Sequence, residues 1–158
     1  MTPVHLILIV AAISTGLFTE LLMTILAFFQ RALKDLTASA FTLVMQRFLE
    51  VVRTHPLHYA LVITSLLAPI AALVLLGTSA GSLTFVLILV GLISFAAGLV
   101  LVSRYLVEPI YDVFLSWEIE SPPENWREAR DRYFRLNVIR GLGSGTTFVL
   151  FLVSLSLP

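Results

Sequence analysis

Five residues in the last third of the sequence combine hydrogen-bond donors and aromatic rings at helical spacing. They are separated by four, three, four and three positions, which places them on one stripe of a helix: Trp126, Arg130, Tyr133, Asn137 and Arg140. This stripe is a candidate ligand-binding surface. A second interpretation is anchoring, because Trp, Tyr and Arg also gather at membrane interfaces. Asn137 fits anchoring least, since an amide that enters hydrocarbon needs partners.

Glu20 is a second candidate for chemistry. It lies in an apolar stretch over residues 4–29, where an acidic side chain costs about 2.5–3.5 kcal/mol on insertion scales. Protonation, or an ion pair with an arginine such as Arg140, would offset that cost. Because Gly16 and Ala27 share its helix face, we expect the carboxyl group to point into a helix bundle. There it serves either as a structural residue or as a group that handles a ligand or a proton.

His55 and His58 are the third candidate. Their spacing of three would allow both to bind a metal ion, with Glu50 or Glu108 as an oxygen ligand. Pro56 lies between them, and His55 and His58 can also be interfacial histidines without a metal. We favour that interpretation. The chain has no cysteine, which excludes disulfides, thiolate nucleophiles and cysteine-ligated metal centres.

The elements that must position these residues are membrane helices. Hydrophobic residues make up 58 % of the 158 positions, against about 45–50 % in soluble domains. Runs of about 20 apolar residues are long enough to cross a bilayer, and the sequence predicts four of them in a single domain over 1–158. They cover about 4–29, 57–76, 83–107 and 134–157. The first run is too long for a signal peptide, so we expect it to be retained.

Two polar segments connect these runs, over 30–56 and 108–133. In the first, apolar residues recur at intervals of three and four, which predicts an amphipathic helix that begins near Thr37 or Ser39. Its predicted buried face is Phe41, Val44, Met45, Phe48, Val51 and Val52. In the second, Ser121, Pro122 and Glu124 predict a helix start at Ser121. Pro109 is expected to end or bend the third run.

The ten Lys and Arg residues all fall in or next to these two polar segments. The positive-inside rule then predicts that both segments face the cytoplasm and both termini lie outside the inner (plasma) membrane. The expected fold is all-α: an antiparallel, up-down-up-down four-helix bundle in the lipid bilayer, with a cytoplasmic amphipathic helix and a polar head. The formal net charge is zero, so no nucleic-acid partner is expected.

Several short motifs resemble those of the anthrone oxygenase-like family of small four-helix membrane proteins. They are Met45-Gln46, His55-Pro56, Glu108-Pro109, and Trp126 with Tyr133, Asn137 and Arg140. The resemblance implies oxidation of a hydrophobic phenolic molecule by dioxygen without a cofactor. It makes Glu20, His55 or His58 the base, and the expected substrate-binding residues are Gln46, Trp126, Arg130, Tyr133, Asn137 and Arg140. The alternative is a non-enzymatic accessory or scaffold subunit that binds a membrane-protein partner.

Overall fold

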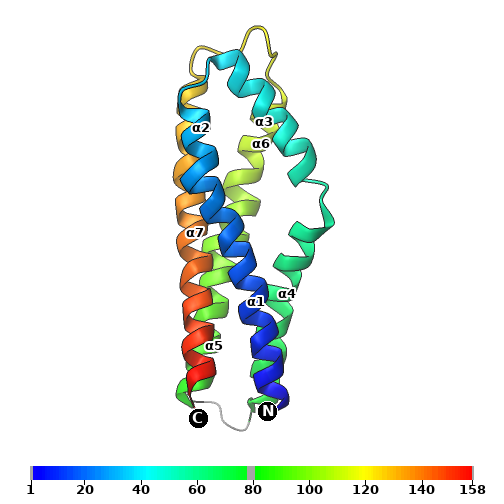
Figure 1. The fold of residues 1–158 in the computed structure, drawn as a ribbon, viewed down its shortest axis with the longest axis vertical. Coiled ribbons are helices and arrows are strands. Elements are labelled where there is room, and N and C mark those ends of the chain that lie inside the picture. The colour runs from blue at the N-terminus through cyan, green and yellow to red at the C-terminus, as the bar shows by residue number, and fades with distance from the viewer. Residues whose placement is uncertain (1, 78–80, 158) are drawn as a thin grey trace.

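The computed structural model describes residues 2–77 and 81–157, and this part of the chain is helical without any strand. Four helices are long and apolar enough to cross a membrane: Pro3–Lys34, Pro56–Leu75, Leu83–Leu115 and Trp126–Ser156. The predictions of an all-α fold and of four long apolar helices are therefore confirmed. In Figure 1 both termini lie at one end of an elongated bundle, and α3 lies at the other end.

The first long helix consists of α1 (Pro3–Thr24), a π-helical turn (Ile25–Phe29) and α2 (Gln30–Lys34). The hydroxyl of Thr2 caps its start by accepting a hydrogen bond from the backbone N–H of His5. The helix continues five residues beyond the predicted end of the first apolar run. Charge alone does not end a helix, and Gln30 to Lys34 includes several strong helix formers and no breaker.

The next pair of helices is α3 (Ala38–Val52) and α4 (Pro56–Leu75). Thr37 caps α3, as predicted, and His55 caps α4. The predicted buried face of α3 was partly wrong. Val44 and Val51 are exposed, whereas Thr42 and Leu49 are buried. Thr42 can be buried because its hydroxyl donates to the carbonyl oxygen of Ala38, one helical turn earlier.

The third long helix joins α5 (Leu83–Phe95) to α6 (Glu108–Leu115) through two π-helical turns, Ala96–Leu101 and Ser103–Val107. Pro109 does not end it. A proline inside an α-helix removes one N–H and clashes with the carbonyl four residues earlier. The wider turn of a π-helix shifts that carbonyl. The π-helical turn immediately before α6 therefore allows the helix to pass through the proline.

The last helix, α7 (Trp126–Ser156), runs without a break past all three of its glycines. Its predicted start at Ser121 was wrong, since the Ser121 hydroxyl donates to Glu118 and the helix begins at Trp126. The reason is the pair Pro122-Pro123, because a proline keeps the residue before it out of the α conformation. The connection between α6 and α7 is accordingly only 116–125.

Small residues bring the helices close together. α7 packs against α1 and α5, and α4 packs against α1 and α5. A Cβ atom added to Gly98 would lie 2.9 Å from the Cα atom of Gly143, so the two backbones are in contact there. Thr147 donates to the carbonyl oxygen of Gly91 at 2.9 Å, and Ser94 donates to that of Gly143 at 3.1 Å. Gly91 and Gly98 therefore both lie where helices approach each other closely, as small residues do in membrane proteins.

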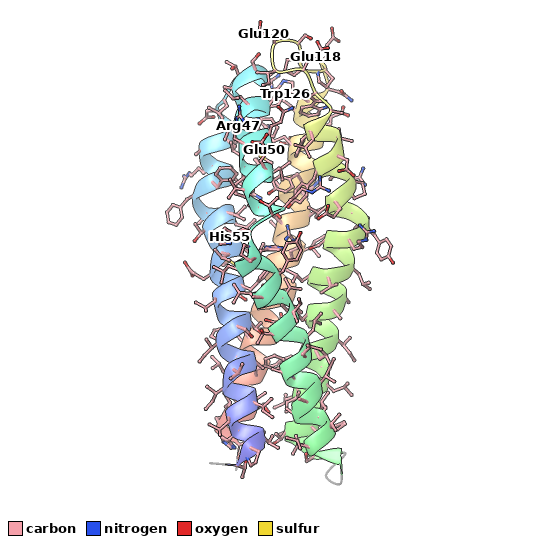
Figure 2. The ribbon with its side chains drawn as sticks, turned by 90° about the vertical axis from the view of Figure 1, so that its right-hand side faces the viewer. Arg47, Glu50, His55, Glu118, Glu120 and Trp126 are labelled. Atoms are coloured by element: carbon pink, nitrogen blue, oxygen red, sulfur yellow. The ribbon has the colours of Figure 1, made fainter. Side chains whose placement is uncertain are left out.

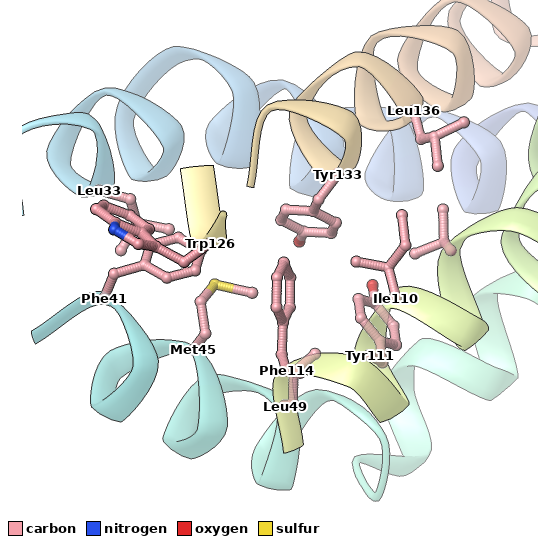
Figure 3. Packing of buried hydrophobic residues seen from close by; sticks show 11 residues of the cluster. Leu33, Phe41, Met45, Leu49, Ile110, Tyr111, Phe114, Trp126, Tyr133 and Leu136 are labelled. Atoms are coloured by element: carbon pink, nitrogen blue, oxygen red, sulfur yellow. The ribbon is translucent and has the colours of Figure 1, made fainter. Parts of the chain in front are cut away.

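The buried apolar side chains form three clusters. Two of them fill the half of the bundle near the termini, around Phe151 and around Phe95. The third fills the opposite half, which we call the head and define as residues 25–55 and 103–139. Figure 3 shows this head cluster, with Trp126 beside Phe41 and Leu33 at one side and Phe114 beside Tyr133 in the middle. The polar segments are thus largely helical extensions of the bundle.

Candidate functional site

The stripe predicted on α7 does face the interior. All five of its residues are buried, with at most 8 % of their surface exposed: Trp126, Arg130, Tyr133, Asn137 and Arg140. The common face is therefore confirmed. Its residues do not share one environment, however, because the helix passes from the tip of the head to the level of the break between α3 and α4.

Trp126 and Arg130 hold the tip of the head together. The Trp126 ring centroid lies 5.3 Å from that of Phe41, and the Arg130 guanidinium lies 5.1 Å from the Trp126 ring centroid. Arg130 also donates through Nη1 to the carbonyl oxygen of Lys34 at 3.0 Å and pairs with Asp131 at 2.9 Å. These contacts join α7 to α2 and α3. They give both residues a packing role and leave them outside the lining of the main apolar pocket.

Gln46 likewise forms hydrogen bonds with the protein backbone. Its Nε2 donates to the carbonyl oxygens of Phe114 at 3.0 Å and Trp117 at 2.9 Å. The last carbonyl groups of a helix have no partner within the helix. Gln46 therefore caps the end of α6 from α3, and its side chain is absent from the pocket described next.

A pocket of about 440 Å³ lies where α3 and α4 separate. Its wall is mostly apolar and comes from α1, the following π-helical turn, α3 and α4. Four lining residues carry polar groups of chemical interest: His55, His58, Tyr111 and Arg140. The apolar lining residues include Phe18, Leu21, Leu22, Ile25, Phe29, Phe48, Val51, Val52 and Leu57. Sites for small molecules have this character, a hydrophobic cavity of roughly 300–1,000 Å³ with few polar groups.

Both predicted histidines line this pocket, but their exposure and their contacts differ. His55 lies at the break between α3 and α4 (Figure 2), is exposed, and caps α4 through Nδ1, which accepts from the Leu57 N–H at 3.3 Å. His58 is half-buried, and its ring lies 5.3 Å from that of Phe18. His58 also lines two neighbouring hollows, of about 370 Å³ and 50 Å³. It is therefore the histidine with an accessible ring inside the bundle.

Arg140, Asn137 and Tyr133 form a group of incompletely bonded polar side chains beside the pocket. Arg140 donates through Nη1 to Asn137 Oδ1 at 2.8 Å. Three buried atoms in this part of the structure have no hydrogen-bond partner: Tyr133 Oη, Asn137 Nδ2 and Arg140 Nε. Buried polar atoms are nearly always satisfied, and exceptions often mark sites of function or of an unseen ligand or water.

Glu20 lies outside this site, so the expectation that it points into the bundle was wrong. Its side chain is exposed, and its only hydrogen bond in the described residues comes from Thr24 at 3.3 Å. The buried face of α1 is set by Thr15, Phe18 and Leu22. A residue two positions from both Phe18 and Leu22 lies about 200° around the helix from each, on the opposite side. Ala27 is exposed as well, so shared spacing with Gly16 did not identify the inner face.

The alternative metal site does not assemble. Glu50 pairs with Arg47 at 3.0 Å, and Glu108 pairs with Arg53 at 2.9 Å. Among residues 2–77 and 81–157, no three His, Asp or Glu side chains come close enough to hold a metal ion.

Arg53 also pairs with Asp112 at 3.0 Å and thus ties the break between α3 and α4 to α6. Desolvation opposes its charge. The hydrogen bonds and attraction of Asp112 and Glu108 outweigh that effect and raise the pKa of Arg53 above its usual value. The guanidinium is therefore charged, and it fixes one side of the opening between α3 and α4.

Sequence reasoning missed Arg53 and Tyr111 as neighbours of the site. Tyr111 is buried, lines the pocket, and its ring lies 5.8 Å from that of Tyr133. The sequence did contain a signal for Tyr111, because its hydroxyl-bearing ring comes one helical turn after Glu108. It was passed over because Pro109 was expected to end or bend the helix there. Comparison of the chain with models of protein families, with curated proteins and with solved structures found no match.

Proposed function

We propose that the chain is a four-span inner-membrane protein whose head faces the cytoplasm and whose spans form an antiparallel bundle. Two lengths support this placement. α4 has 20 residues, or about 30 Å at 1.5 Å per residue, which equals the usual hydrocarbon thickness. The 17 residues from Arg140 to Ser156 cover about 25 Å. The start of α4 and Arg140 then lie near the same boundary of the bilayer, and all basic residues lie at or beyond it.

In this placement the pocket opens at the boundary between hydrocarbon and headgroups. Many large apolar side chains on the outer surface of the helices are exposed, among them Leu17, Leu21 and Leu57. Leu21 and Leu57 also line the pocket. An apolar molecule dissolved in the bilayer would thus reach the pocket without crossing water.

We further propose that this pocket binds an aromatic molecule with a phenolic or enolic oxygen and oxidises it with dioxygen without a cofactor. The observation that carries the proposal is that His58 and Arg140 line the same, mostly apolar pocket. His58 is the base, because its ring is accessible from the pocket, and Arg140 stabilises the resulting anion. Glu20 has no part in this proposal.

The reaction balances for an anthrone. His58 takes a proton from the ring methylene, and the carbanion that forms is delocalised onto oxygen. The carbanion passes one electron to dioxygen, and the two radicals combine to a peroxide that is protonated. Loss of water from the hydroperoxide breaks its O–O bond and gives the quinone carbonyl. One dioxygen is consumed and one water is released for each methylene oxidised.

The test compares two histidine variants in detergent. Purified wild-type protein is mixed with an anthrone in air, and quinone absorbance and oxygen uptake are followed. We expect His58→Gln to lower the rate by about 10²-fold or more, which is typical for loss of a general base. His5→Gln is the matched control, since His5 lies near the N-terminus, and it should keep the wild-type rate.

Equal rates for wild type and His58→Gln would contradict the assignment of the base. A wild-type rate no higher than that of detergent alone would contradict the oxidation itself. If the protein then purified with a membrane complex, the accessory-subunit alternative would take its place.

A further inference from the structure

The charge of Arg140 is buried and has no carboxylate partner. Only 5 % of the residue is exposed. The ion pairs found in residues 2–77 and 81–157 involve Arg47, Arg53 and Arg130, and none involves Arg140. Burying an isolated charge costs free energy, so a buried charge is normally paired or bound to a counter-ion. The neutral amide of Asn137 is a weak substitute for a carboxylate, because hydrogen bonds between two charged groups are stronger.

The unused edge of the Arg140 guanidinium has a defined shape. Nη1 is occupied by Asn137, and the described part of the chain provides no partner for Nε or Nη2. Nε–H and Nη2–H point in parallel from one edge of the planar group. Two parallel donors fit the two oxygens of a carboxylate in a bidentate pair.

The surroundings of the Arg140 side chain fit an amphiphile. Arg140 lines both the apolar pocket of about 440 Å³ and the adjoining hollow of about 50 Å³. The small hollow is polar on several sides, with His58, Tyr59, Ser103 and Arg53 around it, and with Glu108, whose carboxylate is paired with Arg53 at 2.9 Å. The large pocket offers wall residues such as Leu22 and Val52 for an apolar chain. A carboxylate head and a hydrocarbon body therefore each have a matching part of the site.

We propose that this site binds a long-chain fatty acid, with its carboxylate on the Nε and Nη2 edge of Arg140 and its chain in the apolar pocket. The inference uses the pocket and its position at the membrane boundary, and it does not depend on the proposed oxidation. A fatty acid would compete with the aromatic substrate for the same space.

The test measures binding of two matched probes to the purified protein in detergent at alkaline pH. Palmitate and hexadecanol have the same chain length and differ in the charge of the head. We expect wild-type protein to bind palmitate about tenfold or more tighter than hexadecanol, as expected for a charge-assisted pair. Arg140→Gln should abolish this preference and leave hexadecanol binding unchanged. Arg104→Gln, which changes an exposed arginine that lines the neighbouring hollow of about 370 Å³, should keep the preference.

Equal affinities of wild-type protein for the two probes would overturn the proposal, as would a preference that survives in Arg140→Gln. If Arg140→Gln does not fold, Val51→Trp gives a second test. Val51 lines the pocket and is 60 % exposed, so an indole there should block the opening without disturbing the core. Palmitate binding that is unaffected by Val51→Trp would also overturn the proposal. Absence of oxidation in any of these proteins would bear only on the function proposed above.

Discussion

Two amide side chains, the half-buried Gln46 and the buried Asn137, show how residues of similar chemistry take different roles. Gln46 gives its Nε2 to two carbonyl oxygens at the end of α6, at 3.0 and 2.9 Å. Asn137 accepts from Arg140 through Oδ1, while its Nδ2 has no partner. A side chain whose hydrogen bonds are satisfied by the protein has little left for a ligand. We therefore assign Gln46 a structural role. Asn137 remains part of the candidate site, as the residue that orients Arg140.

Removal of the Gln46 amide should lower stability. In Gln46→Met the side chain keeps its approximate size, but the carbonyl oxygens of Phe114 and Trp117 lose the donor that Gln46 provides, and Phe114 keeps a long hydrogen bond of 3.4 Å from the Trp117 N–H. Loss of two hydrogen bonds costs about 1–3 kcal/mol, so we expect a lower midpoint of thermal unfolding in detergent. Arg47→Met is the control, because the Arg47 side chain is 72 % exposed and its ion pair with Glu50 contributes little. An unchanged midpoint for Gln46→Met would return Gln46 to the list of candidate ligand-binding residues.

Residue types alone could not separate these roles. The spacing on α7 correctly placed five side chains on one buried face, because helical periodicity depends on sequence separation only. Which of them reach a pocket depends on the depth of each residue along α7 and on what α3 and α6 bring opposite. Glu20 was misplaced for a related reason. In an apolar helix of a membrane protein the lipid-facing and inner faces are both hydrophobic, so periodicity does not identify the inner one.

At the scale of elements, departures from regular α-helix gather near one level of the bundle. The π-helical turn Ile25–Phe29 follows α1, the break at 53–55 precedes α4, and two π-helical turns over 96–107 precede α6. The pocket lies beside these irregular segments and takes lining residues from the first two of them. π-helical turns are rare and often occur at functional sites. The sequence marked the break through Pro56, but the π-helical turns have no comparable signal.

The backbone contact between α7 and the π-helical turn Ala96–Leu101 should tolerate no added methyl group. A Cβ atom in Gly98→Ala would lie 2.9 Å from the Cα atom of Gly143. The two backbones must then separate, and overpacking of this kind typically costs about 1–3 kcal/mol. Replacing Gly by Ala in a helix gains about 1 kcal/mol of helix propensity. We expect the cost of overpacking to exceed this gain, so the midpoint of thermal unfolding should fall.

Gly77→Ala is the matched control for this contact. It makes the same chemical change, and a Cβ atom at Gly77 meets no atom within 4 Å. Its unfolding midpoint should stay near that of the wild type or rise. A Gly98→Ala protein as stable as Gly77→Ala would show that the π-helical turn Ala96–Leu101 and α7 are less closely packed than the structure has them.

For the whole molecule, helix content was easier to predict than helix ends. Long apolar runs identify the four helices that are long and apolar enough to cross a membrane, because length and hydropathy are local properties. The polar segments 30–56 and 108–133 were expected to form a cytoplasmic amphipathic helix and a polar head. Most of their residues extend α1, α5 and α7, or form α3, around the head cluster (Figures 1 and 3). The head tip carries Glu118 and Glu120 on the short connection to α7 (Figure 2).

The orientation proposed for the molecule in the bilayer rests on the distribution of its charges. The ten Lys and Arg residues all lie at the head side of the proposed membrane boundary or close to it. The connection that contains Gly77 carries no charge. The natural chain lacks cysteine, so single cysteines can report on each end. Ser79, an obvious labelling position in the connection, lies outside the described residues, and Gly77 serves instead. An added side chain there meets no atom within 4 Å.

We expect Gly77→Cys to react with a membrane-impermeant maleimide in intact cells, because the positive-inside rule places the uncharged connection outside. Ser121→Cys, on the exposed connection at the head tip, should react only after the cells are permeabilised. The cysteine-free wild type gives the background in both conditions. Labelling of Ser121→Cys in intact cells, with protection of Gly77→Cys, would reverse the orientation and place the fatty-acid pocket at the outer boundary. Labelling of both cysteines in intact cells would mean that the helix between Gly77 and Ser121, Leu83–Leu115, does not cross the membrane. The chain would then not have four membrane spans.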